Sequence, residues 1–447
     1  MSRQEPLQSA YDFTSAPAPV CLLQGAVELE LDDQRLTGTA DLLLLFLPNP
    51  RVIFRTRVLC EPGRAIHFVL SEPVNPSLSF NGQKIEGFLG NCETDADTLV
   101  LYWHPKFEPV KLRGISSRAS VAVVLHLFNF PDFCGGQHQS AAAPAGCSIL
   151  LLESELWRIS LQSLPNNGTY QAWKKIKNEG GYFLTHVARL ERKDGKPFSQ
   201  EEAHEQRSLL TNVLSFTLGG KFSTVCDVGF DATGERTWSA LSSPRAINAP
   251  YSWFNPFQAN QAERLFPLFA KRWQQSDEWR GCLRSAVYWY AQANTSGGSP
   301  GIDAAIILAQ SALERLAYHH LVVDKQAISA RKLDKLKASE RLRLLFSSLS
   351  LPLDIDTVTP NLLRAAQNFK WVDAPHAMTD IRNELVHPIN KKQVVDCFTD
   401  AWKLSLWYLE LSVLAMCGYD ATYTSRLTAR SVTDSELVPW AKAGNAA

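Results

Sequence analysis

The sequence has no excess charge of either sign. Its 447 residues include 45 lysines and arginines and 45 aspartates and glutamates, so the formal net charge at pH 7 is zero. Proteins that attract nucleic acid or anionic membranes over their whole surface carry a strong basic excess. That class is excluded, and any contact with RNA has to come from a local patch or from a dimer that doubles one.

The sequence also lacks paired cysteines, a secretory signal and a membrane-spanning run. Its nine cysteines are scattered without a Cys-x-x-Cys motif, which indicates free thiols in a reducing compartment. The first 20 residues contain no apolar signal core, and the apolar runs are too short or, at Glu410, interrupted by a charge. We therefore expect a cytoplasmic protein without membrane contact. The length favours two or three domains.

The first half has the patterning of β-structure. Apolar and polar residues alternate at 25–31 and 51–59, a more buried strand is predicted at 119–130, and turn sequences such as "LPNP" and "FNGQ" recur between them. Short strands with frequent turns favour a sandwich or a barrel. We predict a β-rich N-terminal domain at 1–250, with room for two subdomains at 1–150 and 151–250, that serves recognition or regulation.

One helix is predicted inside this half, and the rest follow it. Ser199 and Glu202 form a capping-box pattern, and Gly219 is a suitable end for the helix that they begin. From 255 to 423, apolar residues recur every three or four positions, which predicts an α-helical domain. Residues 424–447 are polar and predict a loosely ordered tail. The expected fold class is α+β and multidomain.

One stretch of the helical half carries residue types suited to cleaving RNA. In "DIRNELVHPIN", residues 380–390, an arginine, an asparagine and a histidine lie within six positions. Because Pro388 disfavours the α region in the residue before it, we expect the helix to end at His387. A histidine can move the protons of the ribose 2′-hydroxyl and the leaving 5′-oxygen, and Arg382 can stabilise the phosphate charge. Asn383 can orient the phosphate by hydrogen bonds.

The spacing of arginine and histidine is not specific by itself. Arg315 and His320 repeat it in "LERLAYHH", and since they lie mid-helix among packing residues we interpret them as a coincidence.

The context of Arg382 and His387 nevertheless resembles the HEPN superfamily. Its helical bundles carry a signature of arginine, one polar residue, three further residues and histidine, and here Asn383 and "ELV" fill the gap. The resemblance covers roughly 255–420. Glu314, in "ALERLAYHH", is similar in position to an acidic residue on the first long helix of such bundles.

The resemblance implies a homodimeric, metal-independent endoribonuclease with no cofactor. Two copies of the signature would share one cleft, in which His387 is the general acid or base and Arg382 stabilises the phosphoryl charge. Asn383 would position the substrate and Glu314 would support the site. Active members of the superfamily cut tRNA or other RNA as toxins or antiviral effectors, so the N-terminal domain would sense an unknown trigger.

Two other functions stay open from the sequence. In a non-catalytic scaffold or sensor, the helical domain only dimerises or binds a partner, and Arg382 and His387 bridge helices. In the other, the β-rich domain binds a small ligand or carbohydrate and regulates the helices. An exposed pair in a basic cleft favours the enzyme, whereas a pair buried against its own chain's carboxylates favours the scaffold.

Three further features are assigned no catalytic role. Cys134, His138 and Cys147 lack a fourth ligand, so no zinc site is expected. His186 alternates with apolar residues on a predicted strand and is interpreted as a core histidine. Trp253 and its aromatic neighbours are expected to join the two domains.

Overall fold

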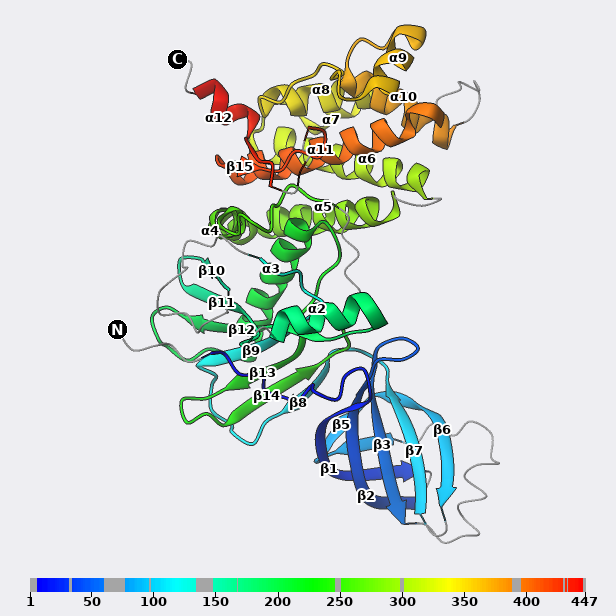
Figure 1. Ribbon diagram of the computed structural model, residues 1–447, viewed down its shortest axis with the longest axis vertical. Helices are drawn as coiled ribbons and strands as arrows, with labels where there is room; N and C mark the ends of the chain where they lie inside the picture. The colour runs from blue at the N-terminus through cyan, green and yellow to red at the C-terminus, as the bar shows by residue number, and fades with distance from the viewer. Residues whose placement is uncertain are drawn as a thin grey trace.

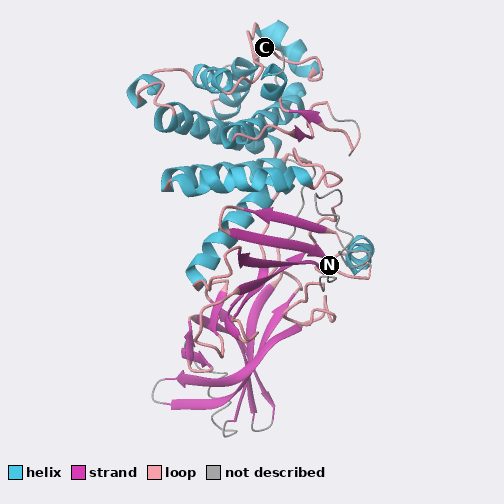
Figure 2. Cartoon of the chain, turned by 90° about the vertical axis from the view of Figure 1, so that its left-hand side faces the viewer, coloured by secondary structure: helices cyan, strands magenta, loops and turns pink. Residues whose placement is uncertain are grey.

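Two antiparallel sheets and a group of helices follow one another along the longest axis of the molecule (Figure 1). The structure is a computed structural model. It describes residues 6–31, 34–59, 77–95, 98–133, 148–166, 168–245, 251–297, 301–387, 395–428, 431 and 433–444. The view turned by 90° shows the same succession, with helices at one end and strands at the other (Figure 2).

The first sheet lies at the end of the molecule and has the strand order β5-β4-β1-β2-β3-β7-β6. Its strands are β1 (Val20–Leu31), β2 (Gln34–Leu45), β3 (Arg51–Leu59), β4 (Ser77–Phe80), β5 (Gln83–Ile85), β6 (Gly87–Asp95) and β7 (Thr98–Pro105). Alternate residues such as Leu42, Phe54 and Trp103 are buried on one face, as period-two patterning requires. On the other face, Arg55 and Arg57 pair with Asp41 at 2.8 and 2.9 Å.

The second sheet has the order β10-β11-β12-β9-β13-β14-β8. Its strands are β8 (Val110–Arg113), β9 (Ala122–Phe128), β10 (Ile149–Glu153), β11 (Trp157–Ser163), β12 (Leu184–Arg192), β13 (Val225–Phe230) and β14 (Arg236–Leu241). One part of it, including Val225 and Leu241, shares a core with the first sheet, and another, including Leu125 and Leu190, shares a core with the helices. It therefore connects the two ends of the molecule.

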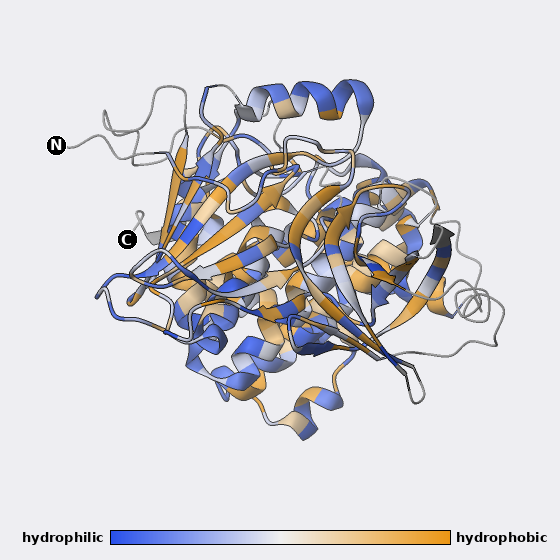
Figure 3. Cartoon of the chain, turned by 90° about the horizontal axis from the view of Figure 1, so that it is seen from below, coloured by the Kyte–Doolittle hydropathy of each residue, from blue (hydrophilic) through white to orange (hydrophobic). Residues whose placement is uncertain are grey.

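Two helices belong to the second sheet. Helix α2 (Gly168–Glu179) lies on its outside and is largely hydrophilic (Figure 3). Helix α3 (Gln200–Leu218) begins at the capping box of Ser199 and Glu202 and ends at Gly219, which has a left-handed φ of 72°. Both predicted ends of this helix are confirmed.

The remaining helices form the C-terminal region. They are α4 (Asn260–Gln275), α5 (Asp277–Ser296), α6 (Ile302–Tyr318), the π-helix η1 (His319–Asp324), α7 (Ala330–Asp334), α8 (Ala338–Ser348), α9 (Pro360–Phe369), α10 (Ala374–Val386), the 3-10 turn η2 (Val395–Cys397), α11 (Phe398–Cys417) and α12 (Pro439–Gly444). Helix α11 is buried over most of its length, which explains its nearly continuous apolar sequence. None of the helices described is long and apolar enough to cross a membrane.

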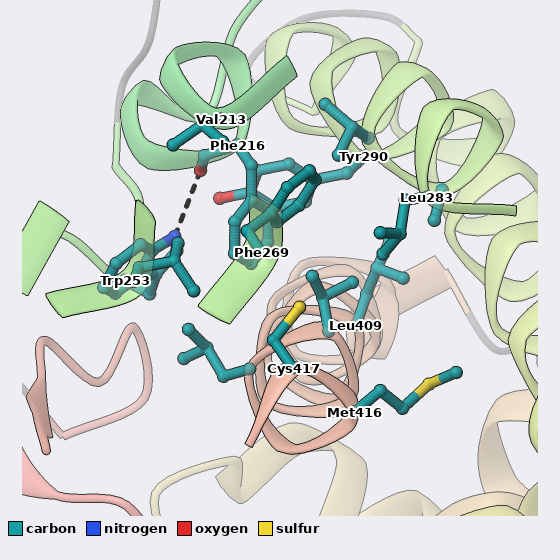
Figure 4. Packing of buried hydrophobic residues seen from close by; sticks show 14 of the residues in the cluster. Val213, Phe216, Trp253, Phe269, Leu283, Tyr290, Leu409, Met416 and Cys417 are labelled. Atoms are coloured by element: carbon teal, nitrogen blue, oxygen red, sulfur yellow. Dashed lines mark hydrogen bonds between the residues drawn. The ribbon is translucent and has the colours of Figure 1, made fainter. Parts of the chain in front are cut away.

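The junction between the second sheet and the helices is an aromatic core. Trp253 is fully buried, and its indole N–H donates to the carbonyl of Phe216 on α3 at 3.1 Å. Tyr290 of α5 packs edge-on against Phe216, and side chains of α4 and α11 complete the core (Figure 4). The predicted joining role of Trp253 is confirmed.

The segment after α11 folds back onto this junction as a strap, residues 419–428 and 433–440. Its short strands β15 (Thr422–Tyr423) and β16 (Glu436–Leu437) pair with each other, and the backbone N–H of Thr424 donates to the carbonyl of Trp253 at 2.6 Å. Arg426 of the strap is buried against Glu410 of α11. The loosely ordered tail predicted for 424–447 is therefore wrong for most of its described residues, because a buried ion pair fixes this segment.

The fold class is confirmed at the level of a multidomain α+β protein, β-rich first and helical second. Within the β-rich part, the chain passes from one sheet to the other between Pro105 and Val110, whereas the sequence had suggested a division at 150. The reason is that β8 and β9 pair with strands that follow residue 150. The expected similarity of the helical part to a HEPN bundle stays a prediction.

Candidate functional site

Helix α10 carries the arginine and the histidine of the candidate site. Asp373 caps its N-terminus and is held by Arg343 at 2.5 and 3.1 Å. Met378 and Ile381 lie three positions apart on one face of the helix, and both are buried in the core. The helix ends at His387, whose φ is −132°. The break expected before Pro388 is therefore observed, although the proline itself lies outside the described residues.

The guanidinium of Arg382 has weak polar partners. Its Nη1 donates to the side-chain carbonyl oxygen of Asn383 at 3.2 Å, and its Nη2 lies 4.0 Å from Oε1 of Glu314 on α6. Its Nε is buried and has no hydrogen-bond partner among the residues that the structure describes. The side chain is 27% exposed, so Arg382 is half-sheltered, charged and incompletely satisfied.

Glu314 occupies the centre of the cluster. Besides Arg382, it lies near Gln310, whose amide donates to Oε1 at 3.4 Å, and near Arg341 of α8, whose Nη1 is 4.0 Å from Oε2. Gln310 also donates to Thr379 of α10 at 3.4 Å. Three helices thus meet at one carboxylate. We call Gln310, Glu314, Arg341, Thr379 and Arg382 the α6–α8–α10 cluster.

His387 lies at the surface, at the end of the same helix. Its backbone N–H donates to the carbonyl of Asn383 at 2.7 Å. Its side chain is exposed and makes no hydrogen bond or ion pair within the described part of the chain. The ring is therefore free to meet a ligand or a second subunit.

The structure brings together three of the four predicted site residues. Arg382 contacts both Glu314 and Asn383, and His387 lies little more than one helical turn further along the chain. Gln310 and Arg341 were missed by sequence reasoning. Arg341 belongs to an ordinary amphipathic helix pattern, and nothing in the sequence distinguishes it from the arginines around it.

The second arginine–histidine pair has a different environment. His320 is buried in the π-helix, 3.9 Å from Asp324, and burial lowers its pKa. Arg315 is exposed. This arrangement agrees with the interpretation of the pair as a coincidence of spacing.

Two buried histidines belong to the β-rich part. His126 accepts a hydrogen bond from the N–H of Ala10 at 3.0 Å and contacts the carbonyl of Val225 at 3.0 Å, and burial lowers its pKa to about 4. His186 lies between Phe130 and Phe133, and burial lowers its pKa to about 3. Both rings are neutral core groups at pH 7, so the interpretation of His186 is confirmed. Cys134, His138 and Cys147 lie outside the described residues.

Comparison with known proteins places this chain in a family. Residues 116–252 match the YopA central domain and residues 276–437 match the YopA C-terminal domain. The chain is 30% identical over 442 residues to the SPbeta prophage-derived uncharacterized protein YopA of Bacillus subtilis (strain 168), covering 97% of this chain and 98% of that protein. The chain belongs to the YopA family. No solved structure matches it.

The two YopA domains agree with the architecture. The central domain spans β9 to β14, and the C-terminal domain spans α5 to β16. Every residue of the α6–α8–α10 cluster lies in the C-terminal domain, as do His387 and Arg426 of the strap.

Proposed function

We propose that the protein is a metal-independent endoribonuclease that acts through Arg382 and His387. One observation carries the proposal: an incompletely satisfied arginine and an exposed histidine lie five positions apart on the last turns of one helix, whose opposite face is buried. A buried helix face provides a rigid support for both groups. A carboxylate, Glu314, holds the guanidinium loosely enough for a phosphate to compete with it.

The reaction that suits these groups is transesterification within RNA. A base removes the proton of the ribose 2′-hydroxyl, the 2′-oxygen attacks phosphorus, and the bond from phosphorus to the 5′-oxygen breaks. His387 acts as this base or gives a proton to the leaving 5′-oxygen. Arg382 stabilises the added negative charge, and Asn383 orients the phosphate. The products are a 2′,3′-cyclic phosphate and a 5′-hydroxyl, and the nucleophile needs no metal because the substrate supplies it.

In a homodimer, the partner subunit would bring a second copy of the arginine–histidine pair to the same cleft. Exposed apolar side chains on α8 and at the two ends of α10 support self-association there, namely Leu344 (41%), Val372 (76%) and Val386 (40%). The prophage-derived relative supports a setting of conflict between phage and host, in which a toxin or antiviral nuclease is useful. In that setting the β-rich part would sense the trigger.

The test is cleavage of labelled total tRNA by purified protein in excess chelator, with the chemistry of the chain ends read out. Wild type should leave cyclic phosphates, and Arg382→Ala and His387→Ala should each lose about 100-fold or more of the rate. Arg315→Ala, at an exposed arginine of α6 outside the α6–α8–α10 cluster, is the matched control and should retain the wild-type rate. Equal rates in all four proteins would contradict the proposal.

The alternative is a non-catalytic scaffold, and one observation favours it. Arg382 on α10 lies 4.0 Å from the carboxylate of Glu314 on α6, as a helix-bridging role requires. In that case both site variants would dimerise less or melt earlier, and none of the proteins would cut RNA.

A further inference from the structure

A second arginine approaches Glu314 from a third helix. Helix α8 packs against both α6 and α10, and Arg341 on α8 reaches Oε2 of the carboxylate at 4.0 Å. Arg382 reaches the other oxygen, Oε1, at the same distance. The three side chains are similarly open to solvent, at 26%, 23% and 27% exposure for Arg341, Glu314 and Arg382. Two guanidinium groups therefore share one accessible carboxylate.

Arg341 is fixed in place without losing its charge. Its Nε donates to the carbonyls of Leu333 and Leu336 at 3.1 and 3.0 Å, and its Nη2 donates to the carbonyl of Asp334 at 2.8 Å. These carbonyls come from the end of α7 and the turn that follows it, and carbonyl oxygens bear no net charge. The remaining nitrogen, Nη1, faces Glu314 and makes no hydrogen bond to the described residues.

The cluster is not closed as a structural ion-pair network would be. A separation of 4.0 Å is too long for a hydrogen bond, so neither arginine donates to Glu314. Within the described chain, Nε of Arg382 and Oε1 of Gln310 are buried without a partner. Half-buried guanidinium groups with unused donors match the oxygens of a phosphate, which accept several hydrogen bonds at once.

We infer that Arg341 binds a phosphate of the RNA strand next to the phosphate held by Arg382. This inference rests on the proposed ribonuclease function. The bound class of molecule is single-stranded RNA, and the two arginines set its path across α8 and α10. Asp334 reduces the attraction, because its carboxylate lies 3.7 Å from Nη2 of Arg341. Its side chain is 88% exposed, so it can be changed without disturbing the core.

The first test is binding of a 2′-O-methyl RNA oligonucleotide, which lacks the nucleophile and is not cleaved, over a range of salt concentrations. Arg341→Gln should weaken binding about tenfold, as loss of a hydrogen bond to a charged group does. It should also lower the slope of log affinity against log salt by roughly 0.7, the value for one phosphate on a single strand. Arg315→Gln removes the same charge from exposed α6 surface and should change neither.

A second variant guards against misfolding of the first. Asp334→Asn removes the competing carboxylate and should tighten binding about twofold to threefold, as an exposed charge pair allows. Tighter binding is the opposite of what loss of the folded site would give. The inference is overturned if Arg341→Gln binds and titrates with salt as wild type does, or if Asp334→Asn binds no more tightly.

Cleavage assays separate this inference from the function on which it rests. If wild type cuts RNA and Arg341→Gln cuts and binds as Arg315→Gln does, the ribonuclease function is supported and the proposed role of Arg341 is refuted. If wild type does not cut RNA but binding depends on Arg341 as described, the RNA-binding role of Arg341 is supported and the ribonuclease function is refuted.

Discussion

The helical region contains two arginine–glutamate clusters that are built in opposite ways. Around Glu410 the side chains of the glutamate and of Arg426 are 0% and 3% exposed. Arg426 donates through Nε at 2.9 Å to one carboxylate oxygen and through Nη2 to the other, and the hydroxyl of Tyr290 donates as well. Burial raises the pKa of Tyr290, so its hydroxyl stays protonated as a donor. Asn294 accepts from the remaining nitrogen of Arg426 at 3.3 Å.

Around Glu314 the arginine side chains do not contact the carboxylate closely. Neither Arg382 nor Arg341 comes closer than 4.0 Å to the carboxylate, and each side chain is about one-quarter exposed. A fully desolvated charge is tolerated only when it is paired and hydrogen-bonded, and this explains why the Glu410 cluster is complete. Solvent screens the Glu314 cluster, so its charges can remain available to a ligand. The Glu410 cluster therefore serves the fold, and the Glu314 cluster is the candidate for function.

The largest effect is expected from opening the closed cluster. Arg426→Ala leaves the Glu410 charge buried without its cation and should lower the free energy of unfolding by about 3–5 kcal/mol. Urea denaturation of wild type and variant measures the difference. Asp334→Asn, at an exposed carboxylate, is the control and should change stability little. A loss below about 1 kcal/mol for Arg426→Ala would mean that the two clusters do not differ as described.

The buried His126 and the exposed His387 extend the comparison from ion pairs to histidine rings. Burial lowers the pKa of His126 to about 4, so the folded protein keeps this ring neutral while the unfolded chain takes up a proton below about pH 6.5. The unfolded state then binds more protons, and stability falls as the pH falls from about 6.5 to 4.

His126 should account for roughly 3 kcal/mol of the free energy of unfolding that is lost by pH 4. Urea denaturation at several pH values measures this loss. His126→Gln should remove that part of the pH dependence. His387→Gln changes an exposed ring and should leave it in place. A pH dependence that survives His126→Gln unchanged would assign it to other groups.

Local patterns in the sequence account for most of the fold that was predicted. Alternation located β1 and β3, and the capping box and glycine located both ends of α3. The proline at 388 located the end of α10, because its effect acts on the neighbouring residue. These signals need no knowledge of which elements pack together.

Contacts between distant elements could not be predicted in this way. Thr359 stands at the N-cap of α9 without a side-chain capping hydrogen bond, and Asp400 of α11 instead accepts from the N–H groups of Asn361 and Leu362 at 2.9 and 3.2 Å. Glu410, a charge in an apolar helix, signals that a buried cation is needed. It does not say which of the 45 lysines and arginines supplies it, and the answer, Arg426, lies in a segment that reads as a polar tail.

The candidate site shows the same limit. The proximity of Glu314 to Arg382 was expected only through the resemblance to HEPN bundles, because 68 residues separate the two positions in the chain. Arg341 had no signal at all. Its position depends on the carbonyl that it contacts at the end of α7 and on the packing of α8 against α6. The residues next to Arg341 in the sequence indicate neither contact.

A smaller change sharpens the description of the closed cluster. Tyr290→Phe removes one donor to Glu410 but leaves Arg426 in place. The cost should be about 2 kcal/mol, the value of a hydrogen bond to a charged group. Urea denaturation checks it, and Tyr288→Phe, at an exposed tyrosine of the same helix, is the matched control. An effect equal to that of Arg426→Ala would show that the phenol, not the ion pair, holds the strap.

The smallest effect on stability is expected where the largest effect on activity is proposed. Arg382→Ala removes a guanidinium that makes no hydrogen bond to Glu314, so the free energy of unfolding should fall by less than about 1 kcal/mol. The double variant with Glu314→Gln should show little coupling between the two positions in a urea-denaturation cycle, because a 4.0 Å pair in contact with solvent contributes little. If Arg382→Ala instead costs as much as Arg426→Ala, the arginine is a structural bridge. The scaffold would then be the better account of the helical domain, since a group that the fold needs so strongly is not free to exchange its carboxylate for a phosphate.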